Sequence, residues 1–401
     1  MKIGILTTSF PRFEGDCSGA FVLAMARAWA ANGHEIRVLA PEPPRRRSAP
    51  QWPGIDVRWV PYARPRGLQQ TFYGSGAPDT LRTHPTTWLG ALSFSAAQTI
   101  AVRLVDDCDA LVSHWCLPSG WIASANAKGR PHLSICHATD VRWLSRVPGA
   151  RTVARQIARG ATSMWFLTEE LRSRFFSIAE LEPSSMTTHI GPMPIEPPPA
   201  VPDHQERWRR KLGIEDSTLL FLGRLVPVKG VDRLIRAVAG LPDDVSLRIA
   251  GDGPERHRLE ALARQLGVNA HFEGWVHGAR KEMLLQSCDA LIVPSHPSDG
   301  VPTVIFEAIA RGLPVVATHL DGLTQHLPKE ALVPQNDPTA LRSALHALVS
   351  RKESVGASVS ASVSASVSVS TSVSASVSAS ASASASASAS VSGTVGPRTI
   401  A

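Results

Sequence analysis

The chain has 401 residues, of which 43% are hydrophobic, and its formal net charge is +7 at pH 7. This length suits two domains of ordinary size, each with a hydrophobic core. No apolar run reaches the about 20 residues that span a bilayer, and the apolar stretch of the N-terminal MKIGILTTSFPR is too short for a signal peptide. The five cysteines are scattered and form no CxxC pair, which argues against structural zinc and indicates a reducing cytoplasm.

Short apolar segments alternate with helical segments through the first half of the chain. One helix is expected over Ala20–Ala31, where Asn32-Gly33 ends it. The expected strands are Lys2–Thr7, Glu35–Ala40, Ala110–Ser113, Pro131–Cys136 and Met164–Leu167. This alternation predicts a parallel, doubly wound sheet over residues 1–190.

A second domain is expected after a proline-rich linker. Residues 191–203 contain six prolines and cannot form the interior of a helix or strand. Over residues 204–352 the alternation resumes, with expected elements Thr218–Leu222, Val231–Ala239, Val245–Ala250, Pro254–Leu266, Ala270–Glu273 and Ala290–Val293. Two such domains place a ligand between the facing carboxyl ends of their strands.

The C-terminal residues 353–401 differ in kind from the rest. Every even-numbered residue from Ser358 to Ser392 is serine, and the residues between them are Ala, Val or one Thr. Because such a repeat lacks a varied apolar surface, it predicts a disordered low-complexity tail. Simple-sequence expansion or a shifted reading frame explains this composition better than a functional tail.

A loop, a helix and a strand near the end of the second domain point to a ligand that is both a phosphate and a polyol. Asp299 lies in a loop broken by Pro302, and Glu307 follows in a helix that Thr303 can start. Backbone N–H groups at such a helix start favour anions, and two carboxylates accept hydrogen bonds from hydroxyls. A sugar nucleotide has both features. An ordinary loop in an α/β domain remains the alternative.

Basic residues and glycines at other expected strand ends fit the same ligand. In FLGRLVPVKG, Arg224 and Lys229 flank a loop before a helix and suit a diphosphate. The segment AGDGPER forms a tight turn but lacks the GxGxxG spacing of a dinucleotide fingerprint. In the first domain, Gly19 lies in a polar loop that can approach a phosphate. His137 and Asp140 follow a strand, where the histidine can bind a sugar hydroxyl or be a structural residue.

The segments GRLVPVKG, GDGPER, FEGWV and DGVPTVIFEAIARGLPVVAT, in this order, resemble a family 4 glycosyltransferase. The resemblance covers roughly residues 1–350 and is strongest over residues 218–318. It implies a GT-B fold, in which two Rossmann-like domains face each other across a cleft. It also implies a retaining, hexosyltransferase-type enzyme that moves a sugar from a UDP- or GDP-sugar to a glycan or lipid-linked acceptor in surface polysaccharide or glycoconjugate synthesis.

The resemblance also assigns roles to particular residues. Those implied in catalysis are His137, Asp299 and Glu307, with Asp299 on the donor-sugar hydroxyls and Glu307 on the ribose. Those implied at the donor diphosphate are Arg224, Lys229, Gly19, Val301, Pro302, Thr303 and Val304. The backbone of Trp275 and Val276 is implied to meet the base. With two cations at the diphosphate, neither a metal nor a cofactor is expected, and no nucleic acid partner is expected.

This chain departs from the family pattern at its donor loop and at its end. Asp299 replaces the usual Glu, which shortens the reach of the carboxylate by about 1.2–1.5 Å. The Ser/Ala/Val repeat occupies the place of the usual C-terminal helix that crosses back onto the first domain. An inactive or truncated protein that binds sugar nucleotides without transfer is therefore the main alternative. A sugar-nucleotide epimerase or a pyridoxal-phosphate phosphorylase is a third reading.

A basic, tryptophan-containing segment suggests a surface for an anionic membrane or acceptor. Its members are Arg45, Arg46, Arg47, Arg58, Arg64, Arg66, Trp52 and Trp59. Such a surface predicts peripheral association with the inner face of the membrane. The alternative is a solvated proline-rich loop.

Overall fold

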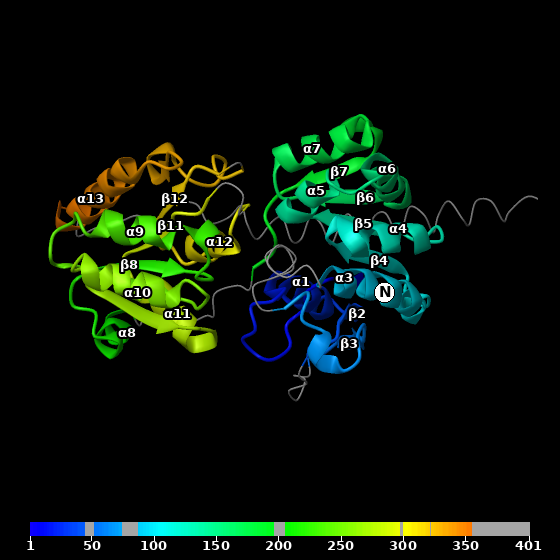
Figure 1. Cartoon of the computed structure of the whole chain (residues 1–401), viewed down its shortest axis with the longest axis horizontal. Coiled ribbons are helices and arrows are strands. Elements are labelled where there is room, and N and C mark those ends of the chain that lie inside the picture. Colours follow the sequence, from blue (N-terminus) through cyan, green and yellow to red (C-terminus); the bar gives the residue numbers. More distant parts are fainter. Residues whose placement is uncertain (45–51, 74–86, 196–204, 297–299, 321, 355–401) are drawn as a thin grey trace, which may run out of the picture.

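The computed structural model describes residues 1–44, 52–73, 87–195, 205–296, 300–320 and 322–354. They form two lobes, each built on a parallel β-sheet with helices on both faces (Figure 1). The predicted pair of Rossmann-like, doubly wound domains is therefore confirmed. Asp299, most of the proline-rich linker and the Ser/Ala/Val repeat lie outside the described residues.

The N-terminal sheet has seven described strands in the order β3-β2-β1-β4-β5-β6-β7, all parallel. These strands are β1 (Lys2–Leu6), β2 (Glu35–Pro41), β3 (Ile55–Val60), β4 (Ala110–His114), β5 (His132–Cys136), β6 (Ser163–Phe166) and β7 (Thr187–Ile190). The helices around it are α1 (Ala20–Ala31), α3 (Thr87–Ala101), α4 (Trp121–Asn126), α5 (Ala138–Leu144), α6 (Ala150–Gly160) and α7 (Glu169–Ala179).

The C-terminal sheet has six described strands in the order β10-β9-β8-β11-β12-β13, again all parallel. These strands are β8 (Ser217–Leu222), β9 (Val245–Ala250), β10 (Ala270–Gly274), β11 (Ala290–Val293), β12 (Val315–Thr318) and β13 (Leu332–Val333). The helices around it are α8 (Gln205–Leu212), α9 (Val231–Val238), α10 (Arg256–Gln265), α11 (Gly278–Ser287), α12 (Thr303–Ile309) and α13 (Pro338–Ser354).

The central strands are continuous apolar runs because helices cover both faces of each sheet. Every residue of β4, β5, β9 and β11 is buried. In both sheets the strand order reverses beside the first strand of the lobe, between β1 and β4 and between β8 and β11. Loops at such a reversal leave a crevice at the carboxyl ends of the strands, which is the usual ligand position in this architecture.

Three sequence expectations need correction. Pro254 is not the first residue of its helix, because α10 begins at Arg256 and the proline lies in the preceding turn. Trp52 does not belong to a basic surface: it is 7% exposed, and its ring packs edge-on against Phe10 at 5.2 Å. Arg66 pairs with the buried Glu42 at 3.1 Å instead of remaining available to a ligand. Trp52 and Arg66 are therefore removed from the predicted basic, tryptophan-containing surface; Arg45, Arg46 and Arg47 lie outside the described residues, so the rest of that surface stays a prediction.

Candidate active site

Loops at the carboxyl ends of both sheets meet between the lobes. A Cβ added to Gly15, in the loop after β1, would lie 2.3 Å from Cγ of His277 in the other lobe. A Cβ added to Gly300, after β11, would lie 2.8 Å from Cβ of Ala138, after β5. Glycine is therefore required at both positions for the two lobes to approach this closely. The candidate residues of the two lobes are brought together here.

The loop after β8 carries Arg224 and Lys229 and is held by the loop after β9. Gly251 has φ +147°, and a Cβ there would lie 1.8 Å from the carbonyl oxygen of Gly223. The amide of Leu225 also donates to the carbonyl oxygen of Asp252 at 2.9 Å. The AGDGPER turn therefore supports the backbone that presents the two cations. This gives its glycines a packing role that needs no phosphate contact.

Glu307 lies on α12, and its carboxylate is paired with a lysine that sequence reasoning missed. Nζ of Lys281, on α11, lies 2.6 Å from Oε2 of Glu307. The carboxylate side chain is 17% exposed and that of the lysine 30%. A second pair, between the guanidinium of Arg311 and Glu282 at 2.8 Å, ties α11 to the turn that follows α12. Lys281 could not be found from the sequence because the pair joins residues of two different helices.

The predicted donor loop before α12 is described in part. Val301, Pro302, Thr303 and Val304 lie at the start of α12, with Pro302 as the residue that precedes its first turn. Asp299 lies outside the described residues, so its role stays a prediction. Trp275, 41% exposed, and Val276 directly follow β10 at the same edge of the sheet. These positions suit the predicted contacts to the phosphates and the base.

His137 lies on the first lobe, beside the contact between Ala138 and Gly300. It directly precedes α5, next to Ala138, and it is buried. Its Nε2 lies 3.3 Å from Nδ1 of His114, and the two rings are stacked with centroids 5.5 Å apart. Burial lowers the pKa of His137 to about 3 and holds that of His114 well below its ordinary value. Both imidazoles are thus neutral near pH 7, so His137 can act by hydrogen bonding but not as a cation.

Asp140 fixes the loop after β4. Its Oδ2 accepts a hydrogen bond from the amide of Cys116 at 2.6 Å. Burial raises the pKa of Asp140 to about 6, against the lowering effect of that hydrogen bond. The carboxylate therefore ties α5, which starts after His137, to the loop that starts after His114.

The loop between β1 and α1 is organised by an internal ion pair. Nε of Arg12 lies 2.6 Å from Oδ2 of the buried Asp16. Burial alone would raise the pKa of Asp16, but the hydrogen bonds from Arg12 lower it below its ordinary value. Gly19 has φ +67°, and a Cβ there would lie 2.3 Å from the carbonyl oxygen of Ser9. Glycine is needed here for the fold of the loop itself, and its predicted approach to the donor phosphate stays a prediction.

The same loop reaches the cations of the other lobe. Burial raises the pKa of the Cys17 thiol to about 11, and the positive charges of Arg224, Arg12 and Lys281 act in the opposite direction. Arg224 and Lys281 therefore lie close enough to the first lobe to influence a thiol there. In the part of the chain that the structure describes, no group of three or more His, Cys, Asp or Glu side chains is arranged to hold a metal ion.

Comparison with known families covers both lobes. Residues 204–357 match the family described as Glycosyl transferases group 1, and residues 18–184 match the Glycosyl transferase 4-like domain. The chain belongs to the group 1 glycosyltransferases of family 4. The first match covers the C-terminal lobe, and the second covers most of the N-terminal lobe.

Two mycobacterial relatives carry the same name, GDP-mannose-dependent α-(1-6)-phosphatidylinositol monomannoside mannosyltransferase. The Mycolicibacterium smegmatis protein is 34% identical over 49% of this chain and 56% of its own length. The Mycobacterium tuberculosis protein is 26% identical over 80% of this chain and 81% of its own length. The alignment with the first relative thus covers little more than half of that protein's length.

Solved structures with low sequence identity share the fold. Sucrose-phosphate synthase from Thermosynechococcus elongatus superposes with a TM-score of 0.65 at 18% identity, over 87% of this chain and 90% of its own. The Anabaena protein HepE, in complex with UDP, gives a TM-score of 0.62 at 18% identity, over 88% and 91%. These likenesses establish the GT-B arrangement of the two lobes.

The pair between Lys281 and Glu307 leads to a prediction about donor binding. Lys281→Met removes the cation that holds the Glu307 carboxylate, and loss of a partly exposed ion pair costs about 1 kcal/mol. We expect the KM for the sugar-nucleotide donor to rise about fivefold while kcat changes little. Steady-state kinetics at saturating acceptor measure both constants.

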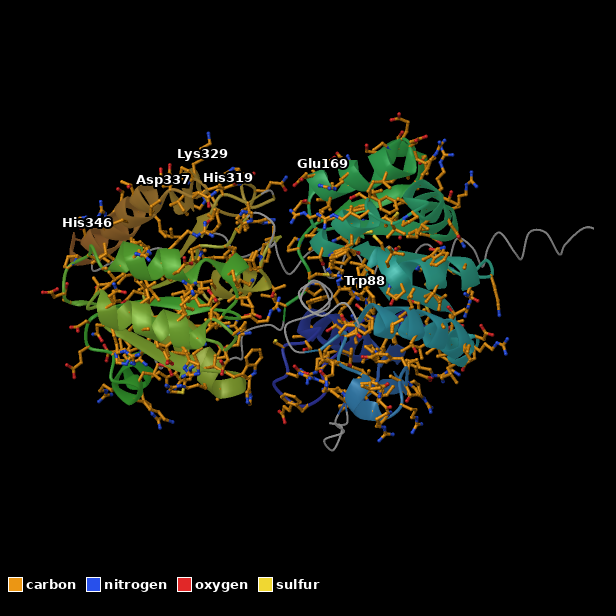
Figure 2. The ribbon with its side chains drawn as sticks, in the orientation of Figure 1. Trp88, Glu169, His319, Lys329, Asp337 and His346 are labelled. Carbon is orange, nitrogen blue, oxygen red and sulfur yellow. The ribbon has the colours of Figure 1, made fainter. Side chains whose placement is uncertain are left out.

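Lys329→Met is the matched control for this lysine. Lys329 is an exposed lysine of the same lobe and lies at the top of that lobe in Figure 2. Its replacement should leave both constants unchanged. An unchanged donor KM in Lys281→Met would show that the pair has no part in donor binding.

Proposed function

We propose that this chain is a retaining glycosyltransferase that moves a sugar from a UDP- or GDP-sugar to a glycan or lipid-linked acceptor. The observation that carries the proposal is the placement of Arg224, Lys229 and Glu307 in one lobe opposite His137 in the other, with the loops of the two lobes in contact. The names of the mycobacterial relatives, which specify GDP-mannose and a phosphatidylinositol acceptor, support testing that donor first.

The chemistry follows from charge separation in the donor. The bond from the anomeric carbon to the diphosphate oxygen breaks, and its electron pair leaves with the diphosphate. The acceptor oxygen forms the new bond to that carbon and passes its proton to the departing diphosphate. Arg224 and Lys229 stabilise the charge that grows on the diphosphate, so they favour the transition state over the bound donor. With these cations in place, we propose that the donor needs no metal ion and no cofactor.

Two further residues bind the donor in this proposal. Oε1 of Glu307 accepts from a ribose hydroxyl while Lys281 holds Oε2. The neutral His137 imidazole hydrogen-bonds a hydroxyl of the donor sugar near the anomeric carbon. Retention requires attack from the face of the leaving group or a covalent intermediate. Asp299, the other residue predicted to contact hydroxyls of the donor sugar, lies outside the described residues.

A reducing, cytoplasmic location is part of the proposal. Cys108, Cys116, Cys136 and Cys288 are buried free thiols, and Cys17 is a free thiol on the loop after β1. The Cys116 thiol donates a hydrogen bond to Sγ of Cys136 at 3.3 Å, and both cysteines are free. Unpaired neighbouring thiols suit a compartment that keeps cysteine reduced. Glycan synthesis would then take place at the inner face of the membrane.

The alternative of an inactive sugar-nucleotide-binding protein rests on the C-terminal repeat, which lies outside the described residues. We favour an active enzyme, because Arg224 and Lys229 follow β8, His137 follows β5 and Glu307 lies in α12. Donor cleavage separates the two readings. An inactive protein would bind the nucleotide but release no free sugar or glycoside from it.

Thermal stability in the presence of UDP, GDP and their sugar conjugates tests the donor site. A ligand at about 100 times its Kd stabilises the folded state by roughly 2.7 kcal/mol, which shifts Tm by a few degrees. We expect one nucleotide series to produce this shift, and Glu307→Gln to remove it. Glu330→Gln, an exposed glutamate of the same lobe, should keep it. No shift with any nucleotide in the wild type would contradict the proposed function.

A further inference from the structure

Helix α3 and the helical turn η2 (Val102–Val105) that continues it turn an apolar face outward. Five large apolar side chains on this face are exposed: Trp88 (43%), Leu89 (70%), Leu92 (66%), Ile100 (70%) and Leu104 (50%). The 19-residue stretch Thr87–Val105 is long and apolar enough to cross a membrane by length and composition, yet only 22% of it is buried. No run of spanning length is expected from the sequence, and this stretch comes close to the about 20 residues that span a bilayer.

The opposite face of α3 packs against the sheet of the N-terminal lobe, so the helix is an integral part of the fold. Phe94, Gln98 and Val102 are buried against the sheet. The side chain of Gln98 donates to the carbonyl oxygen of Thr7 and accepts from Oγ of Ser119 at 3.0 Å. A buried, hydrogen-bonded glutamine holds the helix side-on. The exposed stripe at i, i+3 and i+4 spacing is therefore a fixed surface feature.

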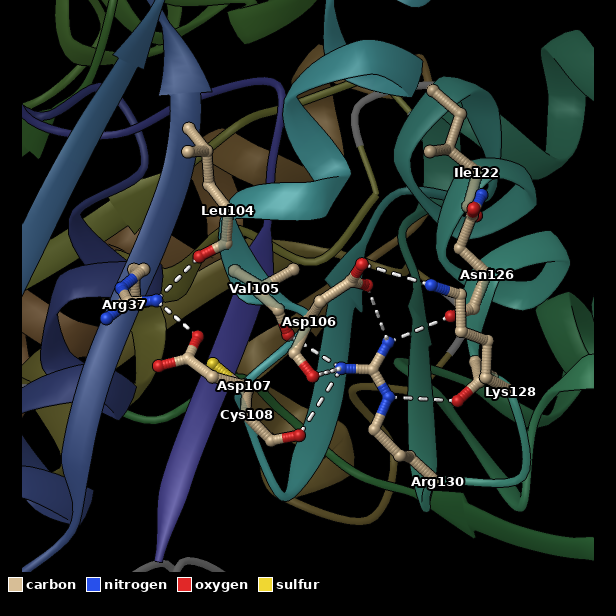
Figure 3. A network of polar contacts seen from close by, with 11 residues as sticks. Arg37, Leu104, Val105, Asp106, Asp107, Cys108, Ile122, Asn126, Lys128 and Arg130 are labelled. Carbon is tan, nitrogen blue, oxygen red and sulfur yellow. Dashed lines mark hydrogen bonds and ion pairs between the residues drawn. The ribbon is translucent and has the colours of Figure 1, made fainter.

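A polar network holds the η2 end of this face (Figure 3). The guanidinium of Arg130 donates to the carbonyl oxygens of Val105, at 2.6 Å, and of Asn126, at 2.9 Å. Arg37 donates to the carbonyl oxygen of Leu104 at 2.6 Å and pairs with Asp107. The carboxylates that follow η2 are thus neutralised by neighbouring cations.

An aromatic pair holds the other end, beside the candidate active site. The ring of Trp88 packs edge-on against that of Trp143, with centroids 5.5 Å apart. The guanidinium of the exposed Arg146 lies 5.5 Å from the Trp143 ring. Trp143 belongs to α5, the helix that begins immediately after His137. Figure 2 places Trp88 in the part of the N-terminal lobe that lies toward the other lobe.

Carboxylates next to the face are paired, Asp106 with Lys128 and Asp107 with Arg37, so the charges that remain at the face are positive. Arg103 is the only charged residue between Thr87 and Val105, and it is exposed. Arg146 adds a second cation at the tryptophan end. Exposed leucine and isoleucine flanked by tryptophan and arginine match the composition of surfaces that lie in a membrane interface. Arginines at the rim attract anionic head groups.

We propose that the outward face of α3 and η2 docks this glycosyltransferase on an anionic lipid bilayer. The helix lies in the plane of the interface, with Leu89, Leu92 and Ile100 among the acyl chains and Arg103 and Arg146 at the head groups. Docking at this face brings the His137 end of the site next to the membrane surface. A second copy on the same face would bring like charges together, so the bilayer is the better match. The inference goes beyond the proposed function and does not depend on donor binding.

Vesicle flotation of the full chain tests this docking. We compare vesicles of phosphatidylcholine and phosphatidylglycerol with vesicles of phosphatidylcholine alone. The wild type should float with the anionic vesicles and less with the neutral ones. The double variant Leu92→Gln/Ile100→Gln should lower binding to anionic vesicles at least about tenfold, because it removes two apolar anchors. Ile190→Gln, at an exposed apolar residue of β7 in the same lobe and outside this face, should bind as the wild type does.

Two outcomes would overturn the docking proposal. One is that the wild type does not float with anionic vesicles, or that the double variant floats as well as the wild type. The other is a dimer in light scattering that the double substitution converts to a monomer, without any vesicle binding; the face would then join two copies. The thermal shift with nucleotides is measured on the same samples. If flotation is lost while nucleotides still raise Tm, the docking proposal fails and the proposed donor site stands. If the protein floats but no nucleotide raises Tm, the docking proposal stands and the proposed donor site fails.

Discussion

Arg224→Ala and Lys229→Ala are each expected to lower kcat for sugar transfer about 100- to 1,000-fold, because each removes a fixed positive charge aimed at the leaving diphosphate. Such a charge acts most strongly in the transition state, where the diphosphate gains negative charge. Initial rates of UDP or GDP release at saturating donor and acceptor measure the loss. The donor KM should change far less than kcat.

Two further arginine substitutions are controls for this prediction. Arg224→Lys keeps the charge but loses the planar pair of donors, so it should recover only part of the rate. Arg236→Ala, on the same lobe in α9, should have no effect. If Arg224→Ala and Lys229→Ala raised KM with kcat unchanged, the cations would bind donor and transition state equally, and the proposed stabilisation of the leaving group would be wrong.

His137→Ala is expected to reduce kcat about 100-fold while the Kd of the free nucleotide stays the same. The reason is that His137 belongs to the first lobe and, in our proposal, contacts the donor sugar, whereas the nucleotide is held by the second lobe. A donor sugar that lies about 1 Å from its reactive position reacts about 100-fold more slowly. Turnover measures the first quantity and titration calorimetry with UDP and GDP the second.

The state of the imidazole adds a pH test to the same variant. Because burial depresses the pKa of His137 to about 3, its neutral form is present throughout the range in which an ordinary histidine would titrate. Wild-type kcat should therefore show no step near pH 6.5 that disappears in His137→Gln. His271→Ala, an exposed histidine of the second lobe, is the control for loss of a ring elsewhere. A weakened nucleotide Kd in His137→Ala would contradict the assigned contact.

Apolar runs bounded by turn residues were sufficient to predict the central elements. The expected helix Ala20–Ala31 and the strands β9 and β11 have the predicted bounds. Strands β3 and β7 were missed because they lie at the edges of their sheet. In β3 exposed or half-exposed residues such as Arg58 alternate with apolar ones, and β7 contains the polar run Thr187–Ile190. Edge strands lack the continuous apolar signal of a strand buried on both faces.

The site residues that could be predicted are those that follow a strand or lie near the start of a helix. Arg224, His137 and Trp275 all directly or closely follow the ends of predicted strands, which is where a doubly wound sheet binds ligands. Lys281 could not be predicted, because its partner Glu307 lies on another helix and the pair depends on how the two helices pack. The outward face of α3 was missed for a related reason. Its composition is that of a core helix, and only the packed structure shows which face meets the sheet.

Release of UDP or GDP from a panel of sugar nucleotides is the most direct test of the central claim that this cleft transfers sugar from a nucleotide donor. We predict that the wild type releases one of the two nucleotides, that GDP-mannose is among the donors to be tried first, and that Glu307→Gln abolishes the release while Glu330→Gln does not. A protein that binds a nucleotide in the thermal assay but releases none from any donor, with or without acceptor lipid, would contradict the claim and identify a binding protein instead.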